Sequence, residues 1–263
     1  MNTNSDRHLS QLFVEGRIGC QSSSQLLTLV HSFENYTINH QDLPQLSAAL
    51  SVDAGAYFDK GIITVFQALA GLDQGHESWA LIKLYYAIYF FLRDELANDG
   101  IAILRCKNIY TLEVQYGAKP VKRAGPRYRG DHHATISLHQ DRFIGRDLLT
   151  SQNIEGESPY NWMKDKREWI NYRRRYFIDQ VGARGISSAD ESFSKQIDRY
   201  CKDTIPIYCF DPDYAALALP IKRAQLSIKS RHNARQSIGE HSDRLSELIN
   251  RSESCRAFLA AIN

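Results

Sequence analysis

The sequence lacks the cysteine pairs, glycine-rich loops and nucleophile motifs that mark several common enzyme classes. Its five cysteines are an odd set without a CxxC spacing, which argues against a disulfide framework and against a cysteine-rich zinc site. No Walker loop, no GxGxxG after a strand and no GxSxG elbow occurs. Kinase, oxidoreductase and esterase activities are therefore disfavoured, and we expect reduced thiols, no cofactor and no metal.

The chain also has little net charge and no apolar run of membrane-spanning length. The net charge is +2 over 263 residues, and 43% of the residues are hydrophobic. This balance is that of an ordinary globular protein, and it does not by itself indicate a nucleic-acid binder. The first residues lack a basic region followed by an apolar core, so we expect no secretory signal and a cytoplasmic location.

The most informative segment is Trp79–Gly100, WALIKLYYAIYFFLRDELANDG. We expect one helix with Ser78 as its N-cap, a polar end at Arg93–Glu95 and Gly100 as its stop. Apolar residues cover nearly every side of this helix, so it belongs at the centre of a helical domain. Its apolar core is shorter than the roughly 20 residues that a bilayer requires.

Further helices are predicted on both sides of this segment. Apolar periodicity indicates two or three helical segments between Ser22 and Ala70. Ser158 and Pro159 predict the cap and first turn of a helix that continues through Trp162 and Trp169 to Phe177. Asp213 is expected to cap another helix, which Pro220 should kink or delay.

The segment after Gly100 changes character. IAILRCKNIYTLEVQYG alternates and is rich in β-branched and aromatic residues, which predicts a small β-hairpin with a turn at Lys107–Asn108. AKPVKRAGPRYRGDHH contains two prolines and two glycines, which is typical of a loop. ATISLHQDRF fits either a short helix or a strand.

We therefore expect a mainly α fold, a helical bundle with a small β-hairpin insertion. We expect three segments along the chain. They are an N-terminal helical segment (1–76), a core that contains the hairpin and the loop after it (77–182) and a C-terminal helical extension (183–263).

The first candidate site is the segment VKRAGPRYRGDHH (121–133), which we call the basic loop. Arginine can contact phosphate through two N–H groups, and a tyrosine between arginines can stack on a base. A solvated loop without specific function is an equally good interpretation. His132 and His133 follow, and a histidine could move a proton at a phosphodiester. The candidate nucleic-acid-binding residues of this loop are Lys122, Arg123, Arg127, Tyr128 and Arg129.

Two further polar segments stand out. On a helix, Arg167 and Glu168 lie one turn before Asn171 and Tyr172, so the four predict a compact polar strip, for which a structural role is favoured over direct catalysis. Arginines at three successive positions follow, and they are candidates for phosphate contact: Arg173, Arg174 and Arg175. A third cationic stretch near the C-terminus fits an acidic partner, a nucleic-acid backbone or a solvated helix face; it comprises Lys222, Arg223, Lys229, Arg231, His232 and Arg235.

The order of these motifs resembles the prokaryotic HEPN-type helical bundles, and the inserted hairpin resembles their YaaC-like relatives. The resemblance covers roughly the middle third of the chain. It rests on YYAIYFFLRDEL, GDHHATISLHQDRF and KREWINY. The matched residues are Tyr85, Tyr86, Ala87, Arg93, His133, Arg167, Asn171 and Tyr172.

The resemblance implies one of two kinds of function. Members of the family are metal-independent ribonucleases or inactive binding modules of defence systems, and the active ones carry an arginine followed by a histidine at a helix start. Arg127 with His132 or His133 fits that spacing, with Arg127 stabilising phosphorane charge and a histidine moving the proton. We expect a nucleic-acid-associated or partner-binding subunit of a prokaryotic defence or stress system, with a ribonuclease or a structural scaffold as alternatives. The expected partners are RNA or DNA, a protein encoded nearby and a second copy of the chain, without a membrane.

Overall fold

The computed structural model describes residues 7–173, 175, 191–231 and 242–262. The chain forms two compact units. Unit 1 comprises Met1–Tyr57 and Leu92–Arg142, and unit 2 comprises Phe58–Phe91 and Phe143–Asn263. The predicted fold class is confirmed at the coarse level, a mainly helical chain with a small antiparallel sheet. The HEPN-type assignment and the three-segment division stay predictions.

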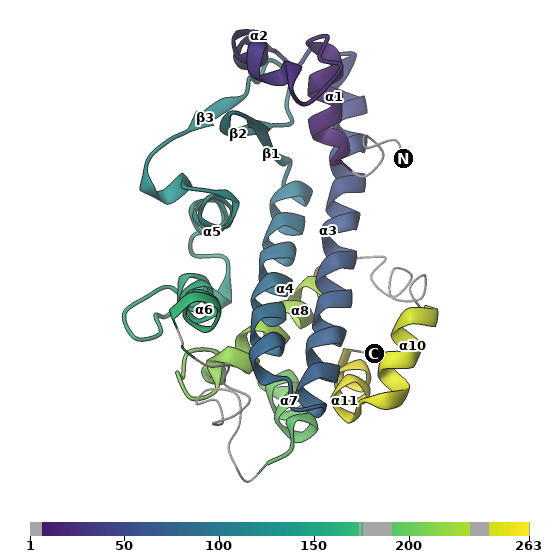
Figure 1. The fold of residues 1–263 in the computed structure, drawn as a ribbon, viewed down its shortest axis with the longest axis vertical. Helices are drawn as coiled ribbons and strands as arrows, with labels where there is room; N and C mark the ends of the chain where they lie inside the picture. The colour runs from purple at the N-terminus through teal and green to yellow at the C-terminus, as the bar shows by residue number, and fades with distance from the viewer. Residues whose placement is uncertain (1–6, 174, 176–190, 232–241, 263) are drawn as a thin grey trace. The chain divides into compact units, whose positions relative to one another are not determined.

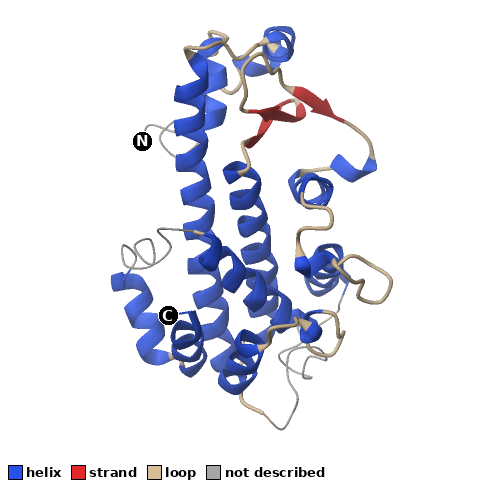
Figure 2. Ribbon diagram, turned by 180° about the vertical axis from the view of Figure 1, so that it is seen from behind, coloured by secondary structure: helices blue, strands red, loops and turns tan. Residues whose placement is uncertain are grey.

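Unit 1 contains the sheet, which is the part of the described chain drawn in red in Figure 2. Two helices, α3 and α4, contribute to both units. The elements of unit 1 are α1 (Leu9–Arg17), a 3₁₀ turn (Gln25–Thr28), α2 (Val30–Asn35), part of α3 (Asp42–Asp73), part of α4 (Glu77–Asn98), β1 (Ile101–Cys106), β2 (Asn108–Glu113), β3 (Val121–Arg123), the 3₁₀ turn η2 (Pro126–Tyr128) and α5 (Asp131–Arg142) (Figure 1).

The predicted hairpin is confirmed as β1 and β2, with the order β1-β2-β3 in the complete sheet. Lys107 makes the turn between β1 and β2 with φ of 63°. The loop prediction for the following segment is wrong at β3, because Val121 pairs with Thr111 and Arg123 with Ile109. The undecided segment after it is helical up to Arg142 and belongs to α5, which ends before Phe143.

The two faces of the sheet differ in character. Leu104 and Tyr110 are paired across β1 and β2 and are fully buried in the core of unit 1. The ring of Phe33 in α2 packs edge-on against Tyr110 with centroids 5.1 Å apart. Arg105, Ile109 and Arg123 lie opposite one another on the other face, because paired antiparallel residues share a face and alternate residues change face. Of the candidate residues on β3, Arg123 lies on this second face, whereas Lys122 pairs with Tyr110 and lies on the first face of the edge strand.

The central helix is confirmed as α4, but two details of the prediction are wrong. α4 begins at Glu77, so Ser78 lies inside the helix and is fully buried instead of capping it. Arg93 and Asp94 are also buried, with 8% and 3% of their surface exposed. Arg93 donates to the hydroxyl of Tyr57 and lies over its ring, so the expected polar end is packed against α3.

Unit 2 is built around the second part of α3 and the first part of α4, which lie side by side in Figures 1 and 2. The ring of Phe91 comes so close to Gly61 that a Cβ there would lie 2.6 Å from it. The other elements are the 3₁₀ turn η3 (Leu148–Thr150), α6 (Pro159–Glu168), the π-helical turn η4 (Trp169–Arg173), α7 (Phe193–Lys202), the 3₁₀ turn η6 (Ile207–Cys209), α8 (Ala215–Ser230), α10 (Ser242–Arg251) and α11 (Glu253–Ile262).

The predicted helix starts of unit 2 are partly confirmed. Ser158 is the N-cap residue of α6 and Pro159 is its first residue, as expected. Phe177 lies outside the described residues. Asp213 does not cap α8, whose N-cap is Tyr214, and Pro220 lies inside the helix instead of delaying it.

All five cysteines are free thiols, and Cys20 is the one that is not buried. None of the described helices is long and apolar enough to cross a membrane.

Candidate functional site

The predicted basic loop is ordered as a strand, a 3₁₀ turn and a helix start. Lys122 lies on β3 and Tyr128 in η2, and His132 belongs to the first turn of α5. Gly125 and Gly130 join these pieces with φ of 95° and 89°, a conformation that side chains other than glycine rarely adopt. We call the accessible surface of β3, η2 and the start of α5 the basic surface; its candidate residues are Lys122, Arg123, Arg127, Tyr128, Arg129, His132 and His133.

Two arginines anchor the basic surface to the sheet. Arg123 donates from Nε to Oγ1 of Thr111 at 2.8 Å, and its guanidinium lies 5.9 Å from the ring centre of Tyr128. Arg105 on β1 donates to Asp131 at the start of α5, with N–O distances of 3.0 and 2.7 Å. Arg123 and Arg105 thus contact η2 and α5 from the sheet, although the half-exposed pair of Arg105 and Asp131 contributes little stability.

Arg127 is held away from the two histidines. Its guanidinium pairs with Asp141 at 2.7 Å, and this hydrogen bond raises the pKa of Arg127. Asp141 follows His133 by eight residues on α5, which corresponds to about 12 Å along the helix axis. Both partners of the ion pair are about half exposed, so the pair contributes little stability and its exchange for a phosphate costs little.

Two further cations of the basic surface have no carboxylate partner among the described residues. Lys122 and Arg129 are exposed, and neither forms an ion pair with a residue that the structure describes. The stretch from Lys119 to His133 contains five lysines and arginines and one acidic residue, Asp131. A local surplus of positive charge therefore lies on a segment whose backbone is fixed by the sheet.

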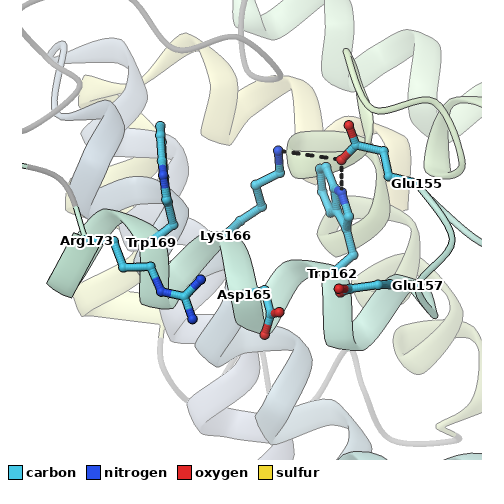
Figure 3. Close-up of a pocket in the computed structure, with 7 residues that line it drawn as sticks. All are labelled: Glu155, Glu157, Trp162, Asp165, Lys166, Trp169 and Arg173. Atoms are coloured by element: carbon cyan, nitrogen blue, oxygen red, sulfur yellow. Dashed lines mark hydrogen bonds and ion pairs between the residues drawn. The ribbon is translucent and has the colours of Figure 1, made fainter.

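The arginine triplet belongs to unit 2. Arg173 is exposed at the end of η4, and Arg175 is exposed as well. Arg174 lies outside the described residues. Together with Trp169, Arg173 lines a cleft along α6 and η4 (Figure 3).

The predicted polar strip does not form as a unit. Arg167 is buried, lies 5.1 Å from the ring centre of Tyr85 and makes a 3.5 Å contact with Glu168. Tyr172 is 76% exposed and, like Asn171, makes no hydrogen bond with the first two residues of the strip in the described chain. The π-helical turn explains the difference, because its i to i+5 bonding breaks the i to i+4 alignment on which the strip depended.

The predicted C-terminal cationic face is wrong for its first two members. Lys222 and Arg223 are buried with 7% and 3% of their surface exposed. Arg231 is half-buried over the ring of Phe58 at 4.6 Å, while Lys229 is exposed. His232 and Arg235 lie outside the described residues.

Sequence reasoning missed a chain of polar groups between α1, α3 and α4. The Tyr57 hydroxyl lies 2.9 Å from Nε2 of His8, whose Nδ1 lies 3.6 Å from Asp53. Arg93 donates to the same hydroxyl. Asp53 also accepts hydrogen bonds from the backbone N–H groups of the first residues of α1. These polar groups together attach α1 to α3. Its members are far apart in sequence, and no spacing rule connects them.

Among the described residues, no group of three or more histidine, cysteine, aspartate or glutamate side chains is arranged to hold a metal ion. No protein-family model, no curated protein and no solved structure matches the chain. The basic surface is therefore interpreted from its own geometry.

Proposed function

We propose that the chain is a nucleic-acid-associated protein that binds the phosphate backbone of RNA or DNA through the basic surface of unit 1. The observation that supports this most is the pair of exposed cations, Lys122 and Arg129, which have no carboxylate partner among the described residues and lie in the same short segment as Arg123 and Arg127. A cation already neutralised by a carboxylate gains less from a phosphate than an unpaired one. These two residues therefore carry the binding in our proposal.

Backbone binding also fits the chemistry of the neighbouring groups. Phosphate contacts are made by lysine, arginine and backbone N–H groups and do not require a base-reading pocket. Tyr128 is half-buried, with the guanidinium of Arg123 5.9 Å from its ring centre, and a base that stacks on the ring adds affinity without sequence preference. We therefore expect single strands to bind at least as well as duplexes.

Binding is favoured over cleavage because of the position of Arg127. A metal-independent ribonuclease would need this guanidinium beside His132 or His133, where phosphorane charge would develop. Arg127 instead pairs with Asp141, about two helical turns along α5 from the histidines. The role as a subunit of a defence or stress system, with a protein partner, is the part of the proposal that the HEPN-like motif order suggests.

The test is fluorescence anisotropy with a labelled single-stranded RNA in EDTA. We expect the parent chain to bind and Lys122→Glu/Arg129→Glu to bind at least tenfold more weakly. The matched control is Lys195→Glu/Lys202→Glu on α7, which changes the net charge equally in unit 2. Equal affinity of the two double variants would refute the proposal.

The same samples test the ribonuclease alternative. Gel analysis of the RNA after incubation shows whether it is cut. Cleavage by the parent chain and its loss in His132→Ala/His133→Ala would replace the binding proposal by the ribonuclease alternative. Intact RNA with both proteins is the result that we expect.

A further inference from the structure

Unit 1 carries a pair of exposed, stacked rings outside the basic surface. The rings of His40 and Tyr116 lie face to face, with their centres 3.9 Å apart and their planes inclined by 14°. Both residues are exposed, and Tyr116 leaves 60% of its surface accessible. Within the described ranges, no other ring and no cationic group packs on Tyr116. The imidazole therefore covers one face of the tyrosine ring, and the other face has no aromatic neighbour.

A tight turn after β2 places Tyr116 in this position. The N–H of Ala118 donates to the carbonyl of Gln115 at 3.2 Å, and Gly117 has φ of 78°. These two features are typical of a type II β-turn, which needs a residue with positive φ at its third position. Tyr116 is the second residue of this turn. Its side chain therefore extends from a corner of the backbone whose conformation is fixed by a hydrogen bond and by a glycine.

Backbone contacts join this turn to the segment that carries the other ring. The N–H of Gly117 donates to the carbonyl of Ile38 at 2.9 Å, and the N–H of Ile38 donates to the carbonyl of Ala118 at 3.0 Å. Ile38 is fully buried in the core of unit 1. The side-chain oxygen of Asn39 accepts from the two backbone N–H groups that follow His40, at 2.8 and 2.9 Å. Because both segments are already fixed, a ligand that stacks on the rings orders little additional backbone.

The chain that leaves the turn carries positive charge toward the basic surface. Between Val114 and Lys122 there are two lysines and no acidic residue. Lys119 is exposed and forms no ion pair with any residue that the structure describes. Lys122 follows Tyr116 by six residues, so their Cα atoms lie at most about 20 Å apart. A nucleic-acid strand that contacts Lys122 is therefore within reach of the stacked rings.

We propose that the open face of Tyr116 is a stacking site for one unpaired base of a single-stranded nucleic acid, with His40 behind the ring and Lys119 as a phosphate contact. This inference rests on the proposed function, because it adds a base contact to the strand that the basic surface holds. Stacking on an aromatic side chain adds affinity and tolerates every base. The bases of a duplex are already stacked on their neighbours, so the site selects single strands over duplexes.

Fluorescence anisotropy with two labelled oligomers tests the stacking on the full chain. One is a short single-stranded RNA of mixed sequence, and the other is its abasic counterpart, which has the same phosphates and no bases. We expect the ratio of the two affinities to fall by about fivefold or more in Tyr116→Leu, because one stacked base contributes a factor of about this size. Tyr116→Phe keeps the ring and should keep the ratio. Tyr172→Leu is the matched control, since Tyr172 is an exposed tyrosine of unit 2.

Two results would overturn the inference while circular dichroism stays unchanged. An equal ratio for the parent chain and Tyr116→Leu would show that no base stacks on this ring. An equal loss of both oligomers in Tyr116→Leu would show that the ring does not act through a base. If Lys122→Glu/Arg129→Glu still weakens RNA binding in either case, the proposed function stands and only the stacking site fails. If neither oligomer binds to the parent chain, both proposals are refuted.

A cross-linking measurement locates the base, and a duplex tests the selection of single strands. 4-Thiouridine in the same RNA cross-links to side chains that it contacts under near-ultraviolet light, and mass spectrometry identifies them. We expect a cross-link to Tyr116 or His40, and the absence of both would overturn the placement of the base. A blunt duplex of the same sequence should bind to the parent chain and to Tyr116→Leu with equal affinity. A weaker affinity of Tyr116→Leu for the duplex would contradict recognition of an unpaired base.

Discussion

Replacement of Lys222 by methionine should destabilise unit 2, because the buried ammonium of this residue caps the C-terminal end of α7. Methionine keeps the unbranched apolar stem and removes the donors, so the change isolates the polar contacts. The ammonium donates to three backbone carbonyls and one side-chain amide: those of Tyr200 (3.2 Å), Cys201 (3.4 Å), Asp203 (2.5 Å) and Gln225 (2.8 Å).

The magnitude follows from these contacts and from the burial of the charge. A hydrogen bond to a charged group contributes about 1.5–3 kcal/mol, and a buried acceptor left without a donor costs about 1–3 kcal/mol. Burial lowers the pKa of Lys222, so part of this gain is offset by the desolvation of the ammonium. We therefore expect a net loss of about 3 kcal/mol, which for a chain of this size lowers the melting temperature by about 6–12 °C.

Thermal unfolding followed by circular dichroism measures this loss. Lys229→Met is the matched control, because Lys229 lies on the same helix and is exposed. We expect the control to unfold within about 2 °C of the parent, in line with the small effect of most surface substitutions. Equal melting temperatures for Lys222→Met and the parent would refute the capping role.

Two further predictions concern stability. Burial alone would raise the pKa of Asp53, but the nearby His8 and hydrogen bonds from the start of α1 together lower it below the ordinary value of 3.8. The ionised carboxylate therefore stabilises the fold above that pH, and this contribution is lost as the pH falls through the lower, folded-state pKa. Asp53→Asn should reduce the free energy of unfolding by about 1–2 kcal/mol at pH 7. It should also lose less stability than the parent as the pH is lowered. Parallel curves of unfolding free energy against pH for the two proteins would contradict the assignment. Gly61→Ala should destabilise unit 2 by about 1–2 kcal/mol, because the overpacking cost against Phe91 exceeds the helix-propensity gain of alanine. Chemical denaturation of Gly61→Ala, Phe91→Leu and the double variant measures the coupling, and strict additivity would show that the two residues do not clash.

Local patterns predicted the elements that depend on near neighbours in sequence. The apolar run after Trp79 predicted α4 because a helix that is apolar on every side needs neighbours on every side. The hairpin followed from alternation and from the turn at Lys107. Both signals are local, and both were confirmed.

Tertiary contacts decided what the sequence could not show. Lys222 was assigned to a cationic face because its charge is visible in sequence, whereas the carbonyls that it caps belong to another helix. β3 was missed because three residues between glycines and prolines gain their pairing only from β2. The cleft at Trp169 depends on a π-helical turn and on a preceding loop, and neither has a reliable sequence signal.

The salt dependence of RNA binding tests the central claim most directly. Each phosphate contact with a single strand contributes about 0.7 to the magnitude of the slope of log K against log salt concentration. Two contacts therefore contribute about 1.4. This slope corresponds to an affinity that is roughly 25-fold higher at about 0.1 M salt than at about 1 M salt. We predict that Lys122→Glu/Arg129→Glu lowers the slope by at least this amount, while Lys195→Glu/Lys202→Glu leaves it unchanged. An identical slope for the parent chain and Lys122→Glu/Arg129→Glu would contradict the assignment of the phosphate contacts to the basic surface.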